Sequence, residues 1–145
     1  MGFRFPMASV LRWRESIEKR EERAMQNLQI EMTRVQLRIE EITDEIAKAN
    51  RELEESLQRW TQAFELNGLQ NEMNAAVDAR QRLTETLAVL KKQKEAQMIV
   101  YLVARSNRRM LTDLEKQHRL AWEQQQERTD QKRLDDVFTS RLIRG

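Results

Sequence analysis

The chain has 145 residues, of which 34% are charged and 6% aromatic, with three glycines, one proline and no cysteine. This composition is typical of long helices or coiled coils, argues against a conventional globular core, and excludes a disulfide framework and a thiolate metal site. The net charge is +2 and the two signs alternate along the chain, whereas duplex DNA binders usually concentrate basic residues on one face, so we expect no nucleic-acid partner.

The N-terminal segment, residues 1–6, has no apolar h-region, so we expect no signal peptide. Pro6 suits the first turn of a helix, where its missing N–H costs nothing. The longest apolar run, Met98 to Val103, is too short to cross a bilayer, so we expect no direct membrane insertion.

The first expected helix covers roughly residues 6–65 and carries a narrow apolar seam. Its apolar residues alternate four and three apart, which is the heptad spacing of two helices that wrap around each other. Because charged residues occupy its other faces, this helix needs a long partner helix rather than a globular core. An eleven-residue step from Ile17 to Leu28 predicts a local interruption of the heptad. The seam consists of Leu28, Met32, Val35, Ile39, Ile42, Ile46, Ala49 and Leu53.

A turn over roughly residues 66–70 is expected to follow, because Asn67-Gly68 is the strongest break in the interior of the chain. A second helix then covers roughly residues 70–140. The short connection makes the helices antiparallel neighbours. The predicted fold class is therefore all-α, a single domain over residues 1–145 that forms a long antiparallel two-helix coiled-coil hairpin.

Folding the chain about Asn67-Gly68 predicts which residues lie opposite each other. Trp13 would lie opposite Trp122. Residues 130–145 would then project beyond the first helix, with apolar side chains that no intramolecular partner covers. These side chains are Leu134, Val137, Phe138, Leu142 and Ile143.

Two apolar clusters on the second helix leave alternatives open. The run Met98 to Val103 wraps the whole circumference of a helix, so it is either a widened local core or a docking belt for another protein. Leu69, Met73 and Val77 lie near the predicted turn. They either close the turn or form a tip that contacts a partner.

No residue pattern points to catalysis. His118 is the only histidine and has ordinary helix-surface neighbours. There is no glycine-rich phosphate loop and no metalloprotease spacing of histidines. We therefore expect no catalytic residue, no metal, no cofactor and no enzyme activity.

The most specific string in the chain is Asp130 to Phe138, with the sequence Asp-Gln-Lys-Arg-Leu-Asp-Asp-Val-Phe. It resembles the signature near the C-terminus of the FliJ family, the stalk proteins of flagellar type III export. The opening Phe3-Arg4-Phe5, followed by Val10 to Glu15, is similar to the aromatic start and charged first helix of that family. Val137, which precedes Phe138, departs from the family pattern.

The resemblance implies a non-enzymatic central stalk and general chaperone component of the flagellar export apparatus. Such a stalk sits at the centre of the FliI-type ATPase hexamer, touches the FlhA-type export gate and handles export chaperones. It implies a cytoplasmic protein that is held peripherally at the inner face of the cell membrane through the export apparatus. The residues that match the family string are Asp130, Gln131, Lys132, Leu134, Asp135 and Asp136. These six residues and Phe138 are expected to contact the ATPase ring. Candidates for the gate are Leu69, Met73 and Val77.

The physical pattern alone also fits a stiff rod that couples two machines mechanically. Two other classes of protein fit it as well. One is a generic coiled-coil adaptor or holdase chaperone, and the other is a homodimeric coiled-coil scaffold. If the protein is a stalk, one copy should bind to each ATPase hexamer. A holdase would bind many clients weakly, and a scaffold would show a molecular mass that depends on concentration.

Overall fold

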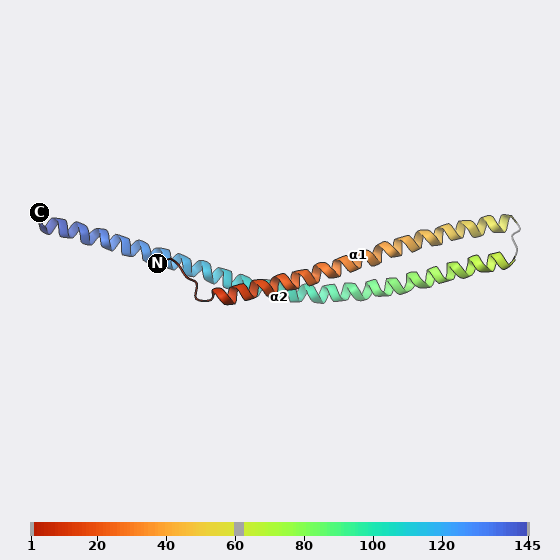
Figure 1. Cartoon of the computed structure of the whole chain (residues 1–145), viewed down its shortest axis with the longest axis horizontal. Helices are drawn as coiled ribbons and strands as arrows, with labels where there is room; N and C mark the ends of the chain where they lie inside the picture. The colour runs from red at the N-terminus through yellow and green to blue at the C-terminus, as the bar shows by residue number, and fades with distance from the viewer. Residues whose placement is uncertain (1, 60–62, 145) are drawn as a thin grey trace. The chain divides into compact units, whose positions relative to one another are not determined.

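The computed structural model describes residues 2–59 and 63–144, which form two helices (Figure 1). Helix α1 runs from Ala8 to Gln58 and helix α2 from Ala63 to Arg144. The two helices pack against each other as a helical hairpin, and this confirms the predicted all-α fold class. Pro6 lies just before α1, where the N–H of Ala8 donates to the carbonyl of Phe5 over 3.2 Å.

The predicted turn at residues 66–70 is wrong. These residues are helical, and α1 and α2 are joined between Gln58 and Ala63 instead. With the earlier connection, Leu66, Leu69 and Met73 stay half-buried at heptad positions of α2. The packing of this apolar stripe therefore outweighs the local turn signal.

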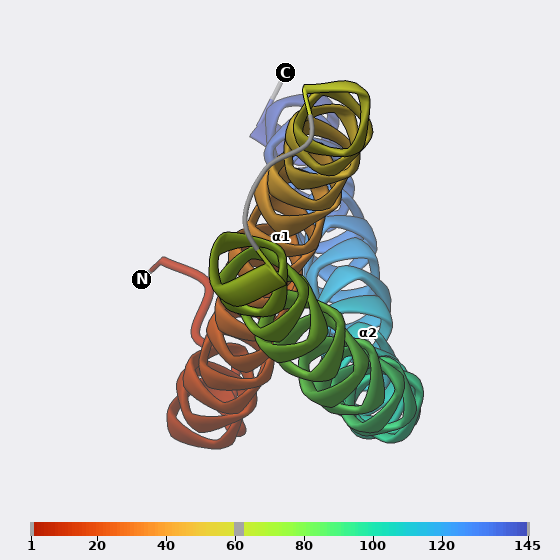
Figure 2. The same cartoon turned by 90° about the vertical axis from the view of Figure 1, so that its right-hand side faces the viewer.

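The chain divides into two compact units. The turn unit is Glu22–Val100, and the terminal unit combines Met1–Glu21 with Tyr101–Gly145. In the turn unit the two helices lie side by side (Figures 1 and 2).

The turn unit buries the predicted seam. Ile42, Ile46 and Leu90 are its most buried side chains, with 3%, 8% and 8% of their surface exposed. Further along α2 the heptad places polar residues on the same stripe, among them the half-buried Lys94. The Nζ of Lys94 donates to Oε1 of Gln29 on α1 over 2.6 Å. The apolar seam is thus interrupted on α2 by a polar contact between the helices.

The terminal unit continues the heptad with charged residues. Leu11 is buried, and Arg14, Glu18 and Glu21 are half-buried at spacings of three and four. The interruption predicted between Ile17 and Leu28 is therefore wrong, because the spacing persists while the residues on it become polar.

The aromatic contacts of the terminal unit fix a different pairing from the predicted one. Trp122 packs on Phe3 with ring centroids 6.1 Å apart, and His118 meets Phe5 edge to face at 5.5 Å. Trp13 is 57% exposed, with the Arg14 guanidinium 4.8 Å from its ring centroid. The predicted pairing of Trp13 with Trp122 is wrong, because the aromatic partner of Trp122 precedes α1.

Candidate interaction site at the C-terminal end of α2

Within the described residues, the last part of α2 has no helix beside it. Every residue from 123 to 144 is exposed, and in Figure 1 this blue part of α2 continues past the start of α1. Because the connection between the helices comes earlier in the chain than predicted, this projecting segment begins before the predicted Asp130. The segment is helical throughout, which confirms the expectation for residues 130–138.

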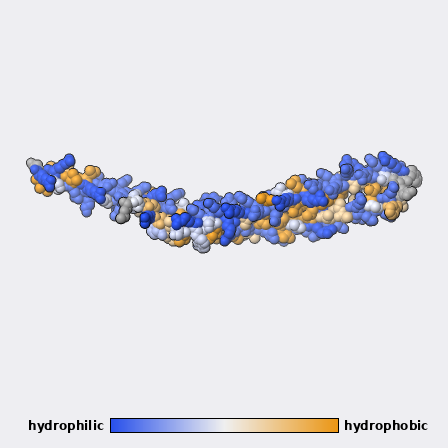
Figure 3. Space-filling model, in the orientation of Figure 1, coloured by the Kyte–Doolittle hydropathy of each residue, from blue (hydrophilic) through white to orange (hydrophobic). Residues whose placement is uncertain are grey.

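Large apolar side chains stand on this projecting segment. Leu134 and Phe138 are each 65% exposed, and Ile143 is 80% exposed. In Figure 3 hydrophobic residues appear in orange near this end, on a mostly hydrophilic surface. A helix that exposes several large apolar residues together is suited to contact another protein.

The apolar face of the segment points away from the side on which α2 meets α1. Continuing the heptad of the terminal unit beyond Trp122 leads to Gln125, Thr129, Lys132 and Asp136, which are all polar. Leu134 and Phe138 are each two residues away from Asp136, which is about 200° around a helix. A partner that binds these two side chains would therefore approach from the side opposite α1.

The polar residues of the segment interact mostly within the helix. The amide of Gln131 donates to Oδ1 of Asp135 over 3.4 Å. Among the described residues no ion pair joins Lys132 to Asp136, although the two residues stand at i,i+4 spacing on the helix. Asp130, Asp135 and Asp136 are all exposed and available to a partner.

A half-buried ion pair joins the two helices in the terminal unit. The Nε of Arg108 donates to Oε2 of Glu18 over 2.6 Å, and an Nη donates to Oε1 over 3.2 Å. A second Nη of Arg108 donates to the Thr112 hydroxyl over 3.5 Å. The hydrogen bonds from Arg108 lower the pKa of Glu18, and those to Glu18 raise the pKa of Arg108. Sequence reasoning missed this pair, although both residues lie at heptad positions.

The run Met98 to Val103 is not a widened core. Tyr101 is half-buried at a heptad position, and the other five side chains are exposed. Ile99, at 66%, is the most exposed of them. The structure leaves these side chains available for contact, as the docking alternative requires.

The residues expected near the turn are only partly accessible. Leu69 and Met73 are half-buried on the heptad stripe, and Val77 is 39% exposed. Phe64, which sequence reasoning missed, is 86% exposed at the start of α2. The misplaced turn explains the omission, because residue 64 was assigned to the last turn of the first helix.

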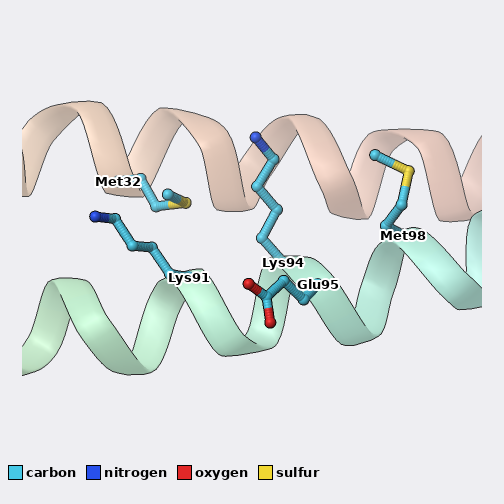
Figure 4. A pocket seen from close by; sticks show the side chains of 5 residues that line it. All are labelled: Met32, Lys91, Lys94, Glu95 and Met98. Carbon is cyan, nitrogen blue, oxygen red and sulfur yellow. The ribbon is translucent and has the colours of Figure 1, made fainter.

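A groove of about 410 Å³ opens in the turn unit beside the polar contact of Lys94 (Figure 4). Two methionines and three charged residues line it, and Figure 4 shows that all but one come from α2. The lining residues are Met32, Lys91, Lys94, Glu95 and Met98. Within residues 2–59 and 63–144 no cluster of His, Asp or Glu could hold a metal ion, and no helix is long and apolar enough to cross a membrane.

Comparison with known proteins decides the family. A family model described as the flagellar FliJ protein matches residues 3–145. The chain belongs to the FliJ family. No curated protein and no solved structure was found to match.

As a FliJ protein, the chain is a non-enzymatic component of the flagellar type III export apparatus. It is the stalk that links the export ATPase to the export gate. The family works on the cytoplasmic side of this apparatus. The helical hairpin is consistent with the role of a stalk, because two packed helices form a stiffer connection than one helix alone.

Proposed function

We propose that residues 123–144 of α2 enter the ring of a FliI-type ATPase hexamer. The observation that carries the proposal is that this segment exposes large apolar side chains while nothing in the described chain covers it. Burial of Leu134 and Phe138 in a partner would contribute about 1.5–3 kcal/mol for each side chain. These two residues are the proposed centre of the contact.

The polar residues around this centre would set the orientation of the segment in the ring. Charged groups at the rim of an interface steer encounter and fix register more than they add affinity. The exposed carboxylates and the lysine match that role, because they flank the apolar face. The proposed rim consists of Asp130, Gln131, Lys132, Asp135 and Asp136.

The part of the turn unit next to the connection between the helices is the proposed contact for an FlhA-type export gate. Among the expected residues, Val77 is accessible, whereas Leu69 and Met73 present only their outer edges. Phe64 offers the largest exposed apolar side chain at this end, and we add it to the contact. In this arrangement the protein is held peripherally at the inner face of the cell membrane, through the export apparatus.

The mechanism we propose is mechanical coupling along the helix pair. The ATPase ring would act on the projecting segment, and the buried seam around Ile42 and Ile46 would transmit the displacement to the turn. The general chaperone role of binding export chaperones would use exposed side chains of the turn unit such as Ile99 and Val100. This role requires no change in the helix pairing.

A double substitution, Leu134→Ala with Phe138→Ala, tests the ATPase contact. Both residues are exposed, so the helical signal and the melting temperature should change little. Stimulation of ATP hydrolysis by the export ATPase should fall at least tenfold, and cells carrying the variant should lose motility. Hydrolysis rates with increasing amounts of the chain measure the effect.

The matched control is Leu120→Ala, because Leu120 is 57% exposed on the same helix but lies outside the segment. This control should stimulate the ATPase as the unchanged chain does. Normal stimulation by the double variant would show that the segment is not the ATPase contact. The turn end, with Phe64, would then be the next candidate.

A further inference from the structure

The groove in the turn unit, here called the methionine–lysine groove, carries two ammonium groups that have no carboxylate partner. Lys94 is half-buried, and Figure 4 shows its side chain between the two methionines of the groove. An ammonium group has three donors, and Lys94 donates one hydrogen bond, to the amide oxygen of Gln29. Within residues 2–59 and 63–144, neither Lys91 nor Lys94 forms an ion pair, not even with Glu95 beside them. The groove can therefore accept negative groups from a partner.

The remaining lining of the groove is apolar and adaptable. Met32 comes from α1 and is half-buried, and Met98 comes from α2 and is 38% exposed. Methionine has three rotatable side-chain bonds and adjusts to irregular partners. The volume of about 410 Å³ lies within the range of pockets that enclose ligands. The groove thus suits an occupant that presents large apolar side chains together with carboxylates.

One face of the projecting segment presents this combination. Glu127, Asp130, Leu134 and Phe138 follow each other at spacings of three and four, so they lie on one side of α2. All four are exposed. This face is acidic in its first half and apolar in its second half. The basic residues within the same stretch lie about 100° or more around the helix from Leu134, and they are Arg128, Lys132 and Arg133.

The groove and this face match in charge and in apolar character. The two carboxylates would meet the ammonium groups of Lys91 and Lys94, and Leu134 and Phe138 would pack on the two methionines. An amphipathic helix that places apolar anchors four residues apart into a groove is a common mode of recognition. Both surfaces belong to α2, which is one continuous helix, so a chain cannot place its own segment in its own groove while that helix is intact. The occupant that fits is a second copy.

We propose that the projecting segment of one copy binds in the methionine–lysine groove of a second copy. The contact joins two different surfaces of the chain, so each pair still has one free groove and one free segment, and association can continue beyond two copies. Leu134 and Phe138 are also the proposed centre of the ATPase contact, so self-association would cover them in copies that have no ring. The proposal goes beyond the ATPase contact and does not depend on it, because self-association is measured without the ATPase.

Sedimentation equilibrium of the full chain alone tests the proposal. The average mass should rise above that of one copy as the concentration increases. The rise should weaken at high salt, because salt screens charges at the edge of a contact. The segment variant, Glu127→Lys with Asp130→Lys, should keep the mass of one copy over the same concentrations. Both positions are exposed, so the helices should form as before.

The groove variant, Lys91→Glu with Lys94→Glu, should abolish self-association from the other side of the contact. Its matched control is Arg82→Glu with Lys92→Glu. The control changes the net charge by the same amount on the same helix, at exposed positions that do not line the groove. It should associate as the unchanged chain does. If circular dichroism shows that the change at the half-buried Lys94 disturbs the helices, Lys91→Glu alone, at an exposed position, replaces the groove variant.

Mixing the two charge variants identifies the surfaces that meet. The groove variant keeps an unchanged segment, and the segment variant keeps an unchanged groove. The mixture should therefore form a complex of one copy of each, although neither variant associates alone. A mass of one copy for the unchanged chain at every concentration, self-association of the segment variant or of the groove variant, or no complex in the mixture would overturn the proposal.

Discussion

The turn unit and the terminal unit join the same two helices by different means. The turn unit relies on buried branched side chains, such as Ile42 and Ile46. The terminal unit has charged residues on the corresponding stripe and uses the Glu18–Arg108 pair together with the ring contact of Phe5 and His118. Apolar burial is non-directional and supplies most of the stability, whereas the polar and aromatic contacts are specific to one alignment.

The largest effect should come from the buried seam of the turn unit. Ile42→Ala removes a side chain that is 3% exposed, so it should lower the free energy of unfolding by about 2–4 kcal/mol. The exposed Glu40→Ala should change it by less than about 0.5 kcal/mol. Urea unfolding followed by circular dichroism measures both. Equal losses would mean that the seam does not carry the stability of this unit.

The ion pair of the terminal unit should contribute less. Glu18→Gln should cost about 2 kcal/mol, because it weakens two charge-assisted hydrogen bonds at a half-buried site. A double-mutant cycle with Arg108→Gln isolates the coupling between the two side chains. A coupling energy near zero would mean that the ion pair does not stabilise the terminal unit and that the aromatic contacts alone make its alignment specific.

The same pair predicts a dependence on pH. The pKa of Glu18 is lowered in the folded chain below its ordinary value of 4.5, mainly by the hydrogen bonds from Arg108. Its contribution to stability should be complete above that ordinary value and be lost as the pH falls through the lowered folded pKa. Comparing unfolding between pH 6 and pH 3 for the unchanged chain and Glu18→Gln measures this contribution. The variant should show the shallower fall, and parallel curves would contradict the assignment.

The aromatic contacts of the terminal unit should have a still smaller effect. Phe3→Leu keeps an apolar side chain but removes the ring that packs on Trp122, at a cost of about 0.5–1.5 kcal/mol. Hydrogen exchange at the start of α1 should accelerate, while exchange around Ile42 stays unchanged. Acceleration in both units would show that they do not open independently.

The sequence predicts the turn unit better than the terminal unit. The apolar residues from Leu28 to Leu53 reveal the seam and the fold class, because apolar side chains at heptad spacing are typical of a helix that packs lengthwise on another helix. At Glu18 the same spacing persists. A charged residue at a heptad position cannot be recognised as part of the helix interface from the sequence until its partner is known. Asn67-Gly68 misled the placement of the turn, since a local signal cannot be weighed against packing over the whole helix.

The sequence predicted that the candidate site is an exposed apolar helix end, but it did not predict where this exposed segment begins. The apolar residues of 130–144 pointed to a projecting end, and all of them are exposed. The side on which they stand could not be predicted, because it depends on which heptad positions meet α1. Phe64 was missed for a related reason. Its exposure at the start of α2 follows from the actual position of the connection, which the sequence did not predict.

The projecting segment has a kinetic consequence. From residue 123 to residue 144 no other part of the described chain covers the helix, so it depends on its own hydrogen bonds, and single helices of this length are marginally stable in water. Its amide protons should therefore exchange by fraying from the C-terminus, well before those of the paired helices. A frayed end sweeps a larger volume than a rigid one and raises the rate of first encounter with a partner. Completing the helix after that encounter then lowers the affinity by the entropy of ordering the segment, so the partner is captured quickly and is still able to leave.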